Sequence, residues 1–260
     1  MSEKIIRVAD GFWNIRGSFR IAGLLDVGTQ ISLVRLGNGK FVFLDSYSMR
    51  SDTLEEVGRL TAEGIEIEAI INLHPFHTVH VENMHAHFPD AALYGTARHV
   101  SRYPDLPWKD LRSEDRALHE QYSEDLDFTI PAGVDFISAN ESVHFSSVMA
   151  YHKPSKTIHV DDTLNYLRLP AAFGLVGMKE RFGFHPTLSR ALQKREGAAA
   201  EFRTWAQDLI DRWGDARTIC AAHSTVLSED RNDGDPIRLR LEKALEKIED
   251  TLRSHERKYG

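Results

Sequence analysis

The chain has 260 residues, of which 42% are hydrophobic and 27% are charged, and this balance is typical of a globular protein rather than of a disordered chain. Its formal net charge of −7 argues against a general nucleic-acid binder or a protein that docks on acidic membranes, because both classes carry a basic surplus. No apolar run of the sequence approaches the ~18 residues of a membrane helix, so we expect no membrane span. The first residues are polar, so we expect no secretory signal. The single cysteine, Cys220, cannot form an internal disulfide, so we expect a cytoplasmic protein.

The first half of the chain predicts short strands, tight turns and a helix, and a second, short helix is expected after the histidine-rich turn that follows residue 73. The clearest turn signal is Gly37-Asn38-Gly39, because Asn and Gly tolerate the positive φ that a tight hairpin requires. The first helix is expected to begin at Ser51-Asp52 and to end at Gly64. The expected strands of this half are 31–36, 40–44, 65–73 and 91–94.

The second half of the chain predicts a hairpin followed by alternating helices and strands. Residues 103–127 are charged and contain two prolines, so we expect a surface segment there. The expected elements are a hairpin of 143–151 with 157–160, a mostly helical stretch at 187–213, a final strand at 217–221 and an amphipathic C-terminal helix at about 236–257. Hairpins followed by strand–helix alternation favour a single layered α/β domain over residues 1–260.

Several histidines and one aspartate stand at the ends of these predicted strands. His74 and His77 follow a buried strand, His144 begins the next hairpin, and Asp162 and His223 each follow a strand. Side chains so far apart in sequence can meet only if the strands lie side by side, and this is how dispersed ligands assemble a metal site. The predicted metal ligands are therefore His74, His77, His144, Asp162 and His223.

The order of these segments resembles that of the metallo-β-lactamase superfamily, and the resemblance covers most of the chain. The segments that carry it are 41–46, which ends a strand in aspartate, 68–77, 143–147, 160–164 and 221–224. The resemblance implies an α/β (α+β) fold of four layers, an αββα sandwich. It also implies a metal-dependent hydrolase.

The sequence departs from that family's His-x-His-x-Asp-His motif at two positions. With His77 matched to the last histidine and His74 to the second, Asn72 replaces the first histidine and Phe76 replaces the aspartate. A second register, with His77 and His80 on the motif, would place proline and valine at ligand positions, so we favour the first. An amide oxygen is a weak zinc ligand beside imidazole, and phenylalanine is none. These substitutions favour a single ion over a pair, although one or two zinc ions, or iron, all stay open.

The resemblance implies hydrolysis by metal-activated water, because Zn²⁺ lowers the pKa of bound water from ~15.7 toward ~7. Asp162 would hold the ion and orient the water, and His185 is the candidate proton donor to the leaving group. The expected substrate is a small ester, lactone, amide or phosphoester, without nucleic acid or membrane as a partner. Two alternatives stay open, namely a non-catalytic binding module on the same fold and an iron-binding redox protein. The charged C-terminal helix leaves a homo-oligomer open.

Other residues of these types have simpler interpretations. Asp45 is expected to bond the loop backbone near the site, and Cys220 to be a buried hydrophobic residue. Trp205 and Trp213 are expected to pack in the core. The histidines expected at the surface or behind the site are His80, His85 and His87, and those with no assigned role are His99, His119, His152, His159 and His255.

Overall fold

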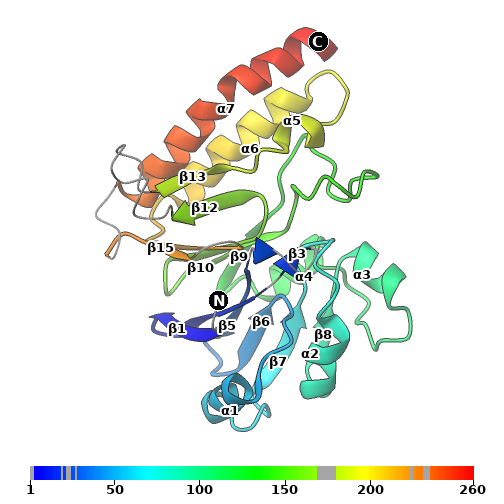
Figure 1. Cartoon of the computed structure of the whole chain (residues 1–260), viewed down its shortest axis with the longest axis vertical. Coiled ribbons are helices and arrows are strands. Elements are labelled where there is room, and N and C mark those ends of the chain that lie inside the picture. The colour runs from blue at the N-terminus through cyan, green and yellow to red at the C-terminus, as the bar shows by residue number, and fades with distance from the viewer. Residues whose placement is uncertain are drawn as a thin grey trace. The chain divides into compact units, whose positions relative to one another are not determined.

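The computed structural model describes residues 3–18, 20–21, 25–26, 28–168, 180–222, 225–230 and 235–260 (Figure 1). The chain divides into two compact units, each with its own sheet and hydrophobic core. Unit 1 comprises Met1–Phe128 and His152–Ser155, and unit 2 comprises Thr129–Tyr151 and Lys156–Gly260. The expectation of a single domain over residues 1–260 stays a prediction.

Unit 1 is built on a six-stranded sheet in the order β1-β2-β5-β6-β7-β8. Its strands are β1 (Lys4–Ala9), β2 (Phe12–Gly17), β5 (Thr29–Arg35), β6 (Phe41–Leu44), β7 (Ile67–Ile71) and β8 (Ala92–Tyr94), and a small separate hairpin consists of β3 (Arg20–Ile21) and β4 (Leu25–Asp26). The predicted hairpin is confirmed: β5 and β6 are antiparallel, and Gly39 in their turn has a φ of +84°. β7 runs parallel to both β6 and β8, so the carboxyl ends of these three strands meet at one edge of the sheet.

Short helices pack on the sheet of unit 1. They are α1 (Ser51–Leu60), α2 (Val81–His87), α3 (Ala97–Arg102) and α4 (Arg116–Gln121). Val57 of α1 and Met84 of α2 are fully buried in the same apolar cluster as Phe43 and Ile70 of the sheet.

Unit 2 has a second sheet, in which β15 (Val226–Ser228), β14 (Thr218–Ala221), β11 (Thr157–Val160) and β10 (Met149–His152) follow one another in that order. The next strand in the order, β9 (Leu126–Thr129), spans the unit boundary. β11 and β14 are parallel, with Val160 opposite Ala221, so both strands end at the same edge. A separate hairpin pairs β12 (Leu164–Arg168) with β13 (Glu180–Phe184).

Three helices complete unit 2: α5 (Leu188–Ala191), α6 (Ala198–Trp213) and α7 (Ile237–Tyr259). Phe202, Trp205 and Trp213 of α6 are buried with Leu241 and Leu252 of α7 in the core of this unit. The predicted packing roles of both tryptophans are therefore confirmed. The C-terminal helix is also confirmed and extends slightly beyond the predicted end.

Several predicted element boundaries are wrong. Residues 143–148 are not part of a strand, because the backbone N–H of Ser147 donates to the Thr163 hydroxyl at 3.3 Å instead of to a neighbouring strand. The strand at 217–221 is not the last one, since β15 follows it. The helical stretch 187–213 is interrupted between α5 and α6, where Gly197 has a φ of +78°. The surface segment 103–127 contains α4, and β1 and β2 had no counterpart among the predicted elements.

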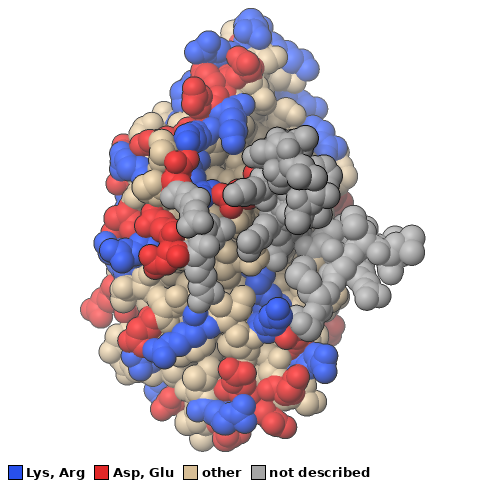
Figure 2. All heavy atoms as spheres, turned by 60° about the vertical axis from the view of Figure 1, so that its left-hand side comes forward, with Lys and Arg blue, Asp and Glu red and all other residues tan. Residues whose placement is uncertain are grey.

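Acidic and basic side chains are intermixed over the face drawn in Figure 2. The ion pairs of the protein include those of Arg238, which contacts both Asp211 and Glu242, at 3.0 and 3.1 Å. Within the described ranges, no helix is long and apolar enough to cross a membrane.

Candidate metal centre

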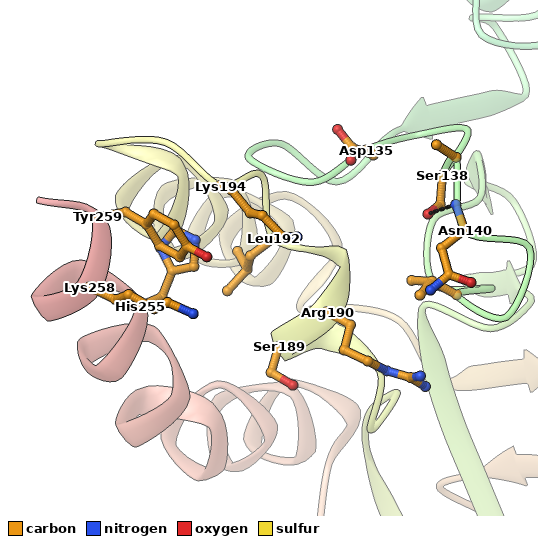
Figure 3. A pocket seen from close by; sticks show the side chains of 12 residues that line it. Asp135, Ser138, Asn140, Ser189, Arg190, Leu192, Lys194, His255, Lys258 and Tyr259 are labelled. Atoms are coloured by element: carbon orange, nitrogen blue, oxygen red, sulfur yellow. Dashed lines mark hydrogen bonds between the residues drawn. The ribbon is translucent and has the colours of Figure 1, made fainter.

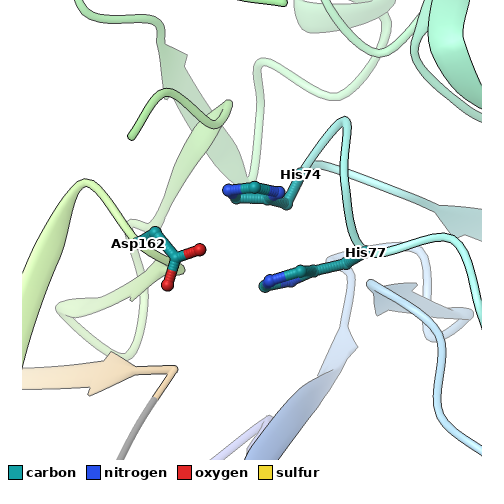
Figure 4. Close-up of side chains that lie close together, drawn as sticks. All are labelled: His74, His77 and Asp162. Atoms are coloured by element: carbon teal, nitrogen blue, oxygen red, sulfur yellow. The ribbon is translucent and has the colours of Figure 1, made fainter. Parts of the chain in front are cut away.

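The loop after β7 brings the first two predicted ligands together. His74 is fully buried, and its ring stacks on that of His77 with 4.0 Å between centroids and 19° between planes (Figure 4). A ring nitrogen of each residue lies within 4.8 Å of the other. The His77 N–H donates to the His74 carbonyl at 3.0 Å, and this bond closes the turn. The loop therefore presents two adjacent imidazoles at the carboxyl edge of the sheet.

Asp45 holds the start of this loop. It follows β6 with a φ of +69°, a left-handed conformation that Asp tolerates better than most residues. One of its carboxylate oxygens accepts the N–H of Leu73 at 2.8 Å and that of His74 at 3.4 Å. The predicted role of Asp45 in bonding the loop backbone is confirmed.

The hydrogen bonds of His74 indicate which ring nitrogen can bind a metal. The Phe76 N–H donates to Nδ1 of His74 at 3.1 Å, so Nδ1 carries the lone pair and the proton of the neutral ring sits on Nε2. A cation would take the place of this N–H at Nδ1. Imidazole is a usual ligand of zinc and iron, and the stacked rings of His74 and His77 place two of them side by side, so the residues present fit a metal ion.

Asn72 and Phe76, the two residues that depart from the family motif, contact other residues of unit 1. The Asn72 amide oxygen accepts the Ser46 hydroxyl at 2.6 Å, and its NH₂ group donates to the Tyr94 carbonyl at 2.9 Å. Asn72 therefore ties β6, β7 and β8 together. The Phe76 ring lies under the Arg98 guanidinium, 4.6 Å from its centre.

His99 has a role that the sequence did not assign. This fully buried residue in the first turn of α3 accepts the Thr96 N–H at Nδ1, 3.2 Å away, in a capping box. Its Nε2 lies 3.3 Å from the His77 carbonyl oxygen, and burial lowers the pKa of His99 to about 3. The only sequence signal for this role is a histidine three residues after a threonine at the end of a strand, the spacing of a capping box.

The other histidines near this loop are half-buried or exposed, as expected. His80 is half-buried and shares a hydrogen bond of 2.9 Å with the Ser48 hydroxyl. Burial, together with the neighbouring His77, lowers the pKa of His80. His85 is half-buried and His87 is exposed.

In unit 2, Thr163 connects the segments that carry the other candidates. Its hydroxyl donates to the Phe145 carbonyl at 2.9 Å and accepts the Ser147 N–H at 3.3 Å, and its own carbonyl accepts the His185 N–H at 3.2 Å. This fully buried threonine thus joins the backbones that follow His144 and Asp162 to that of His185.

The candidate side chains of unit 2 differ in burial. Asp162, two residues beyond β11, is 4% exposed, and His144 is half-buried. Asp161, the competing carboxylate, has an oxygen within 4.8 Å of a ring nitrogen of His159. His223 follows β14 in sequence but lies outside the described residues.

His185 lines a cavity of about 620 Å³ within unit 2, together with Phe184, Leu188 and Ile248. The Thr187 N–H donates to Nδ1 of His185 at 3.2 Å, which leaves the proton of the neutral ring on Nε2. The side chain can therefore donate a proton from Nε2.

Solved structures with the same fold cover almost the whole chain. The DIM-1 metallo-β-lactamase is 13% identical, with a TM-score of 0.60 over 95% of this chain and 99% of that one. A metallo-β-lactamase from Erythrobacter litoralis is 12% identical, with a TM-score of 0.59 over 94% and 96%. FIM-1 from Pseudomonas aeruginosa, in its mono-zinc form, is 12% identical, with a TM-score of 0.57 over 95% and 96%. The chain has the metallo-β-lactamase fold.

The metallo-β-lactamase fold confirms the predicted fold class. Similarity at this level is structural only: no family model matches the chain, and no curated protein matches it. In the described part of the chain, His74 and His77 follow β7 and Asp162 follows β11, while Asn72 bonds to Ser46 and Tyr94 and the Phe76 ring lies under Arg98.

A second cavity of unit 2, of about 440 Å³, lies around α5 and the end of α7 (Figure 3). Its lining includes Arg190, Lys194 and Lys258, but none of the candidate metal ligands that the structure describes. His255, also in this lining, shares a hydrogen bond of 2.9 Å with the Gln193 carbonyl, a contact that holds α7 to the chain before α6.

Proposed function

We propose that the protein is a metal-dependent hydrolase that binds one zinc ion and acts on a small ester, lactone, amide or phosphoester. The proposed ligands are His74, His77, His144, Asp162 and His223. The observation that carries the proposal is the stacked pair His74–His77, because their rings stand at the carboxyl edge of a sheet with a ring nitrogen of each within 4.8 Å of the other. The mono-zinc form of FIM-1, which has the same fold, supports zinc over iron, and Asn72 and Phe76 at two motif positions favour one ion over two.

The proposed chemistry depends on a few residues of this chain. A bound zinc ion would supply hydroxide from water near neutral pH and would polarise a carbonyl or phosphoryl oxygen. Asp162, in its buried position, would bind the ion through one carboxylate oxygen and orient the water through the other. Thr163 keeps that carboxylate and the His144 segment in a fixed relation through its two hydroxyl bonds.

His185 is the proposed proton donor to the leaving group. Its Nδ1 accepts the Thr187 N–H, so the proton available to a substrate sits on Nε2. The cavity of about 620 Å³ that His185 lines is bordered by Phe184, Leu188 and Ile248. We propose that the leaving group, or an apolar part of it, enters this cavity.

A second candidate function is a metal-binding module without catalysis. It is favoured by the packing roles of Asn72 and Phe76, because a position that holds an aspartate ligand in the family motif carries a ring under Arg98 here. An ion with fewer anionic ligands could still bind while turnover is lost.

Elemental analysis of protein purified without added metal tests the proposal. We expect about one zinc per chain, and we expect His74→Ala and His144→Ala to lose it. His87→Ala is the matched control, since His87 is exposed on α2, and it should keep its metal. Stoichiometric iron would favour the redox alternative, and no metal after reconstitution would refute the proposal.

Activity separates the hydrolase from the binding module. A panel of ester, lactone, amide and phosphodiester substrates should show turnover that His144→Ala removes together with the metal. Zinc binding without turnover of any class would favour the module. His185→Gln should lower kcat for substrates with poor leaving groups while metal content is unchanged, because His185 is assigned to proton donation.

The remaining proposals concern the cellular location, the partners and the oligomeric state of the protein. Cys220 is the single cysteine of the chain and is buried, which suits a reducing compartment, and we propose a cytoplasmic location. We propose a small-molecule substrate as the main partner. Light scattering at several concentrations would show whether the chain also forms a homo-oligomer.

A further inference from the structure

His99 stands where it can hold one of the proposed metal ligands in place. It follows β8, the strand next to β7, and the carboxyl ends of these parallel strands lie at the same edge of the sheet. The turn His74–His77 is fixed at its start by Asp45 and closed by the bond from His77 N–H to the His74 carbonyl. The His77 carbonyl is the last polar group of this turn, and it faces Nε2 of His99 at 3.3 Å.

The protonation of His99 is set by its other nitrogen. The Thr96 N–H donates to Nδ1 at 3.2 Å, so the ring's proton must be on Nε2. Nε2–H therefore donates to the His77 carbonyl, and this direction cannot reverse while the capping box of α3 is intact. The helix cap and the ligand loop are coupled through one imidazole.

The ring itself has little freedom to move. His99 is fully buried, and Trp108 packs near it with 6.1 Å between ring centroids. A Cβ at Gly95 would lie 2.6 Å from the Trp108 ring and 2.8 Å from Cβ of His99, so only glycine permits this close packing. A packed and bonded ring can transmit the position of α3 to the loop.

We propose that His99 is a positioning residue for His77, and that its Nε2–H bond to the His77 carbonyl raises the affinity of the loop for the metal ion. The inference rests on the proposed metal site and adds a residue that does not touch the ion. Groups that orient ligands in this way typically change metal affinity by ~10–100-fold when they are removed.

Two substitutions separate the bond to His77 from the helix cap. In His99→Asn, the amide oxygen can replace Nδ1 and accept the Thr96 N–H, but the side chain is too short to reach the His77 carbonyl. In His99→Gln, the amide nitrogen can reach the position of Nε2 and donate to His77, and the amide oxygen can accept the Thr96 N–H, as Gln does at this position of a capping box. Thr96→Val is a control that removes the threonine hydroxyl, 2.9 Å from Nδ1, and leaves the bond to His77.

The readout is the zinc affinity of the apoprotein, measured by competition with a chromophoric chelator, together with the melting temperature. We expect His99→Asn to weaken zinc binding about tenfold, and His99→Gln and Thr96→Val to stay within about threefold of wild type, although Thr96→Val should have a lower melting temperature. Wild-type affinity in His99→Asn would overturn the inference. So would affinity losses that follow the loss of stability in all three variants.

Two further results keep the test decisive. If His99→Asn does not fold, ¹⁵N NMR of the wild-type histidine rings reports the proton position directly, and a proton on Nδ1 of His99 would overturn the inference. Wild-type protein that binds no zinc would refute the proposed function and this inference with it. Zinc binding that depends on His74 but not on the His99 bond would refute the inference alone.

Discussion

Replacing Thr163 by valine tests the connection that organises unit 2. Valine has nearly the same shape as threonine but no hydroxyl, so Thr163→Val removes a donor from the Phe145 carbonyl and an acceptor from the Ser147 N–H. Thr163 is fully buried, and water cannot replace either bond without rearrangement. Each buried group left without a partner costs about 1–3 kcal/mol. We therefore expect a loss of about 2–4 kcal/mol in the free energy of unfolding, a large share of the ~5–15 kcal/mol of a typical domain.

Urea denaturation at 25 °C and pH 7.5, followed by tryptophan fluorescence, measures this loss, and the m-value shows whether the unfolded state has changed. Thr163→Ser is the matched control, because it keeps the hydroxyl and removes one methyl group, for which we expect a loss of about 1 kcal/mol. If valine costs no more than serine, the hydroxyl bonds do not hold the segment and the reasoning is wrong.

Three other outcomes follow from particular residues. Burial lowers the pKa of His152 to about 4, against opposing contributions from Asp125 and the Arg35 backbone. Between pH 6.5 and 4 the imidazole is therefore protonated in the unfolded chain but stays neutral in the folded protein. The neutral ring contributes its full share to the free energy of unfolding above pH 6.5, and this share falls by about 3 kcal/mol as the pH drops through 4. His152→Asn should flatten this part of a curve of unfolding free energy against pH. Gly17→Ala should lower stability by about 1–3 kcal/mol in urea titrations, because its Cβ would lie 2.1 Å from the buried Tyr47 ring, and a cost below 0.5 kcal/mol would contradict that packing. Chelation by EDTA should lower the melting temperature and added zinc should restore it, since a ligand at 100 times its Kd stabilises the native state by about 2.7 kcal/mol; no shift in either direction would count against a bound ion.

The fold was largely predictable where local chemistry and burial point the same way. The turn at Gly37-Asn38-Gly39 gave the β5–β6 hairpin because few other residues accept that backbone, and the continuous apolar run of β7 matches its burial on both faces. The segment 143–148 was predicted wrongly because Val143 and Phe145 alternate with polar residues as in a strand, whereas the Ser147 N–H donates to Thr163, sixteen residues away. A partner so distant leaves no local signal.

The part of the candidate site that lies in unit 1 was predictable for some residues and not for others. Asp45 and the pair His74 and His77 follow from strand ends, since the end of a buried strand limits where a polar side chain can go. Asn72 was interpreted as a weak ligand, but its amide oxygen accepts the Ser46 hydroxyl. His99 carried no functional pattern, because its importance depends on β8 lying beside β7, which only the tertiary structure shows.

Cys220 lies opposite His159 in the parallel pairing of β11 with β14, and it is fully buried. It is also the sole thiol of the chain. A thiol reagent can therefore label the native protein only when these strands separate, so the labelling rate reports how often this sheet opens. Cys220 of the wild-type protein therefore serves as a probe of the separation of β11 and β14. A reporter group added at this buried position would disturb the packing.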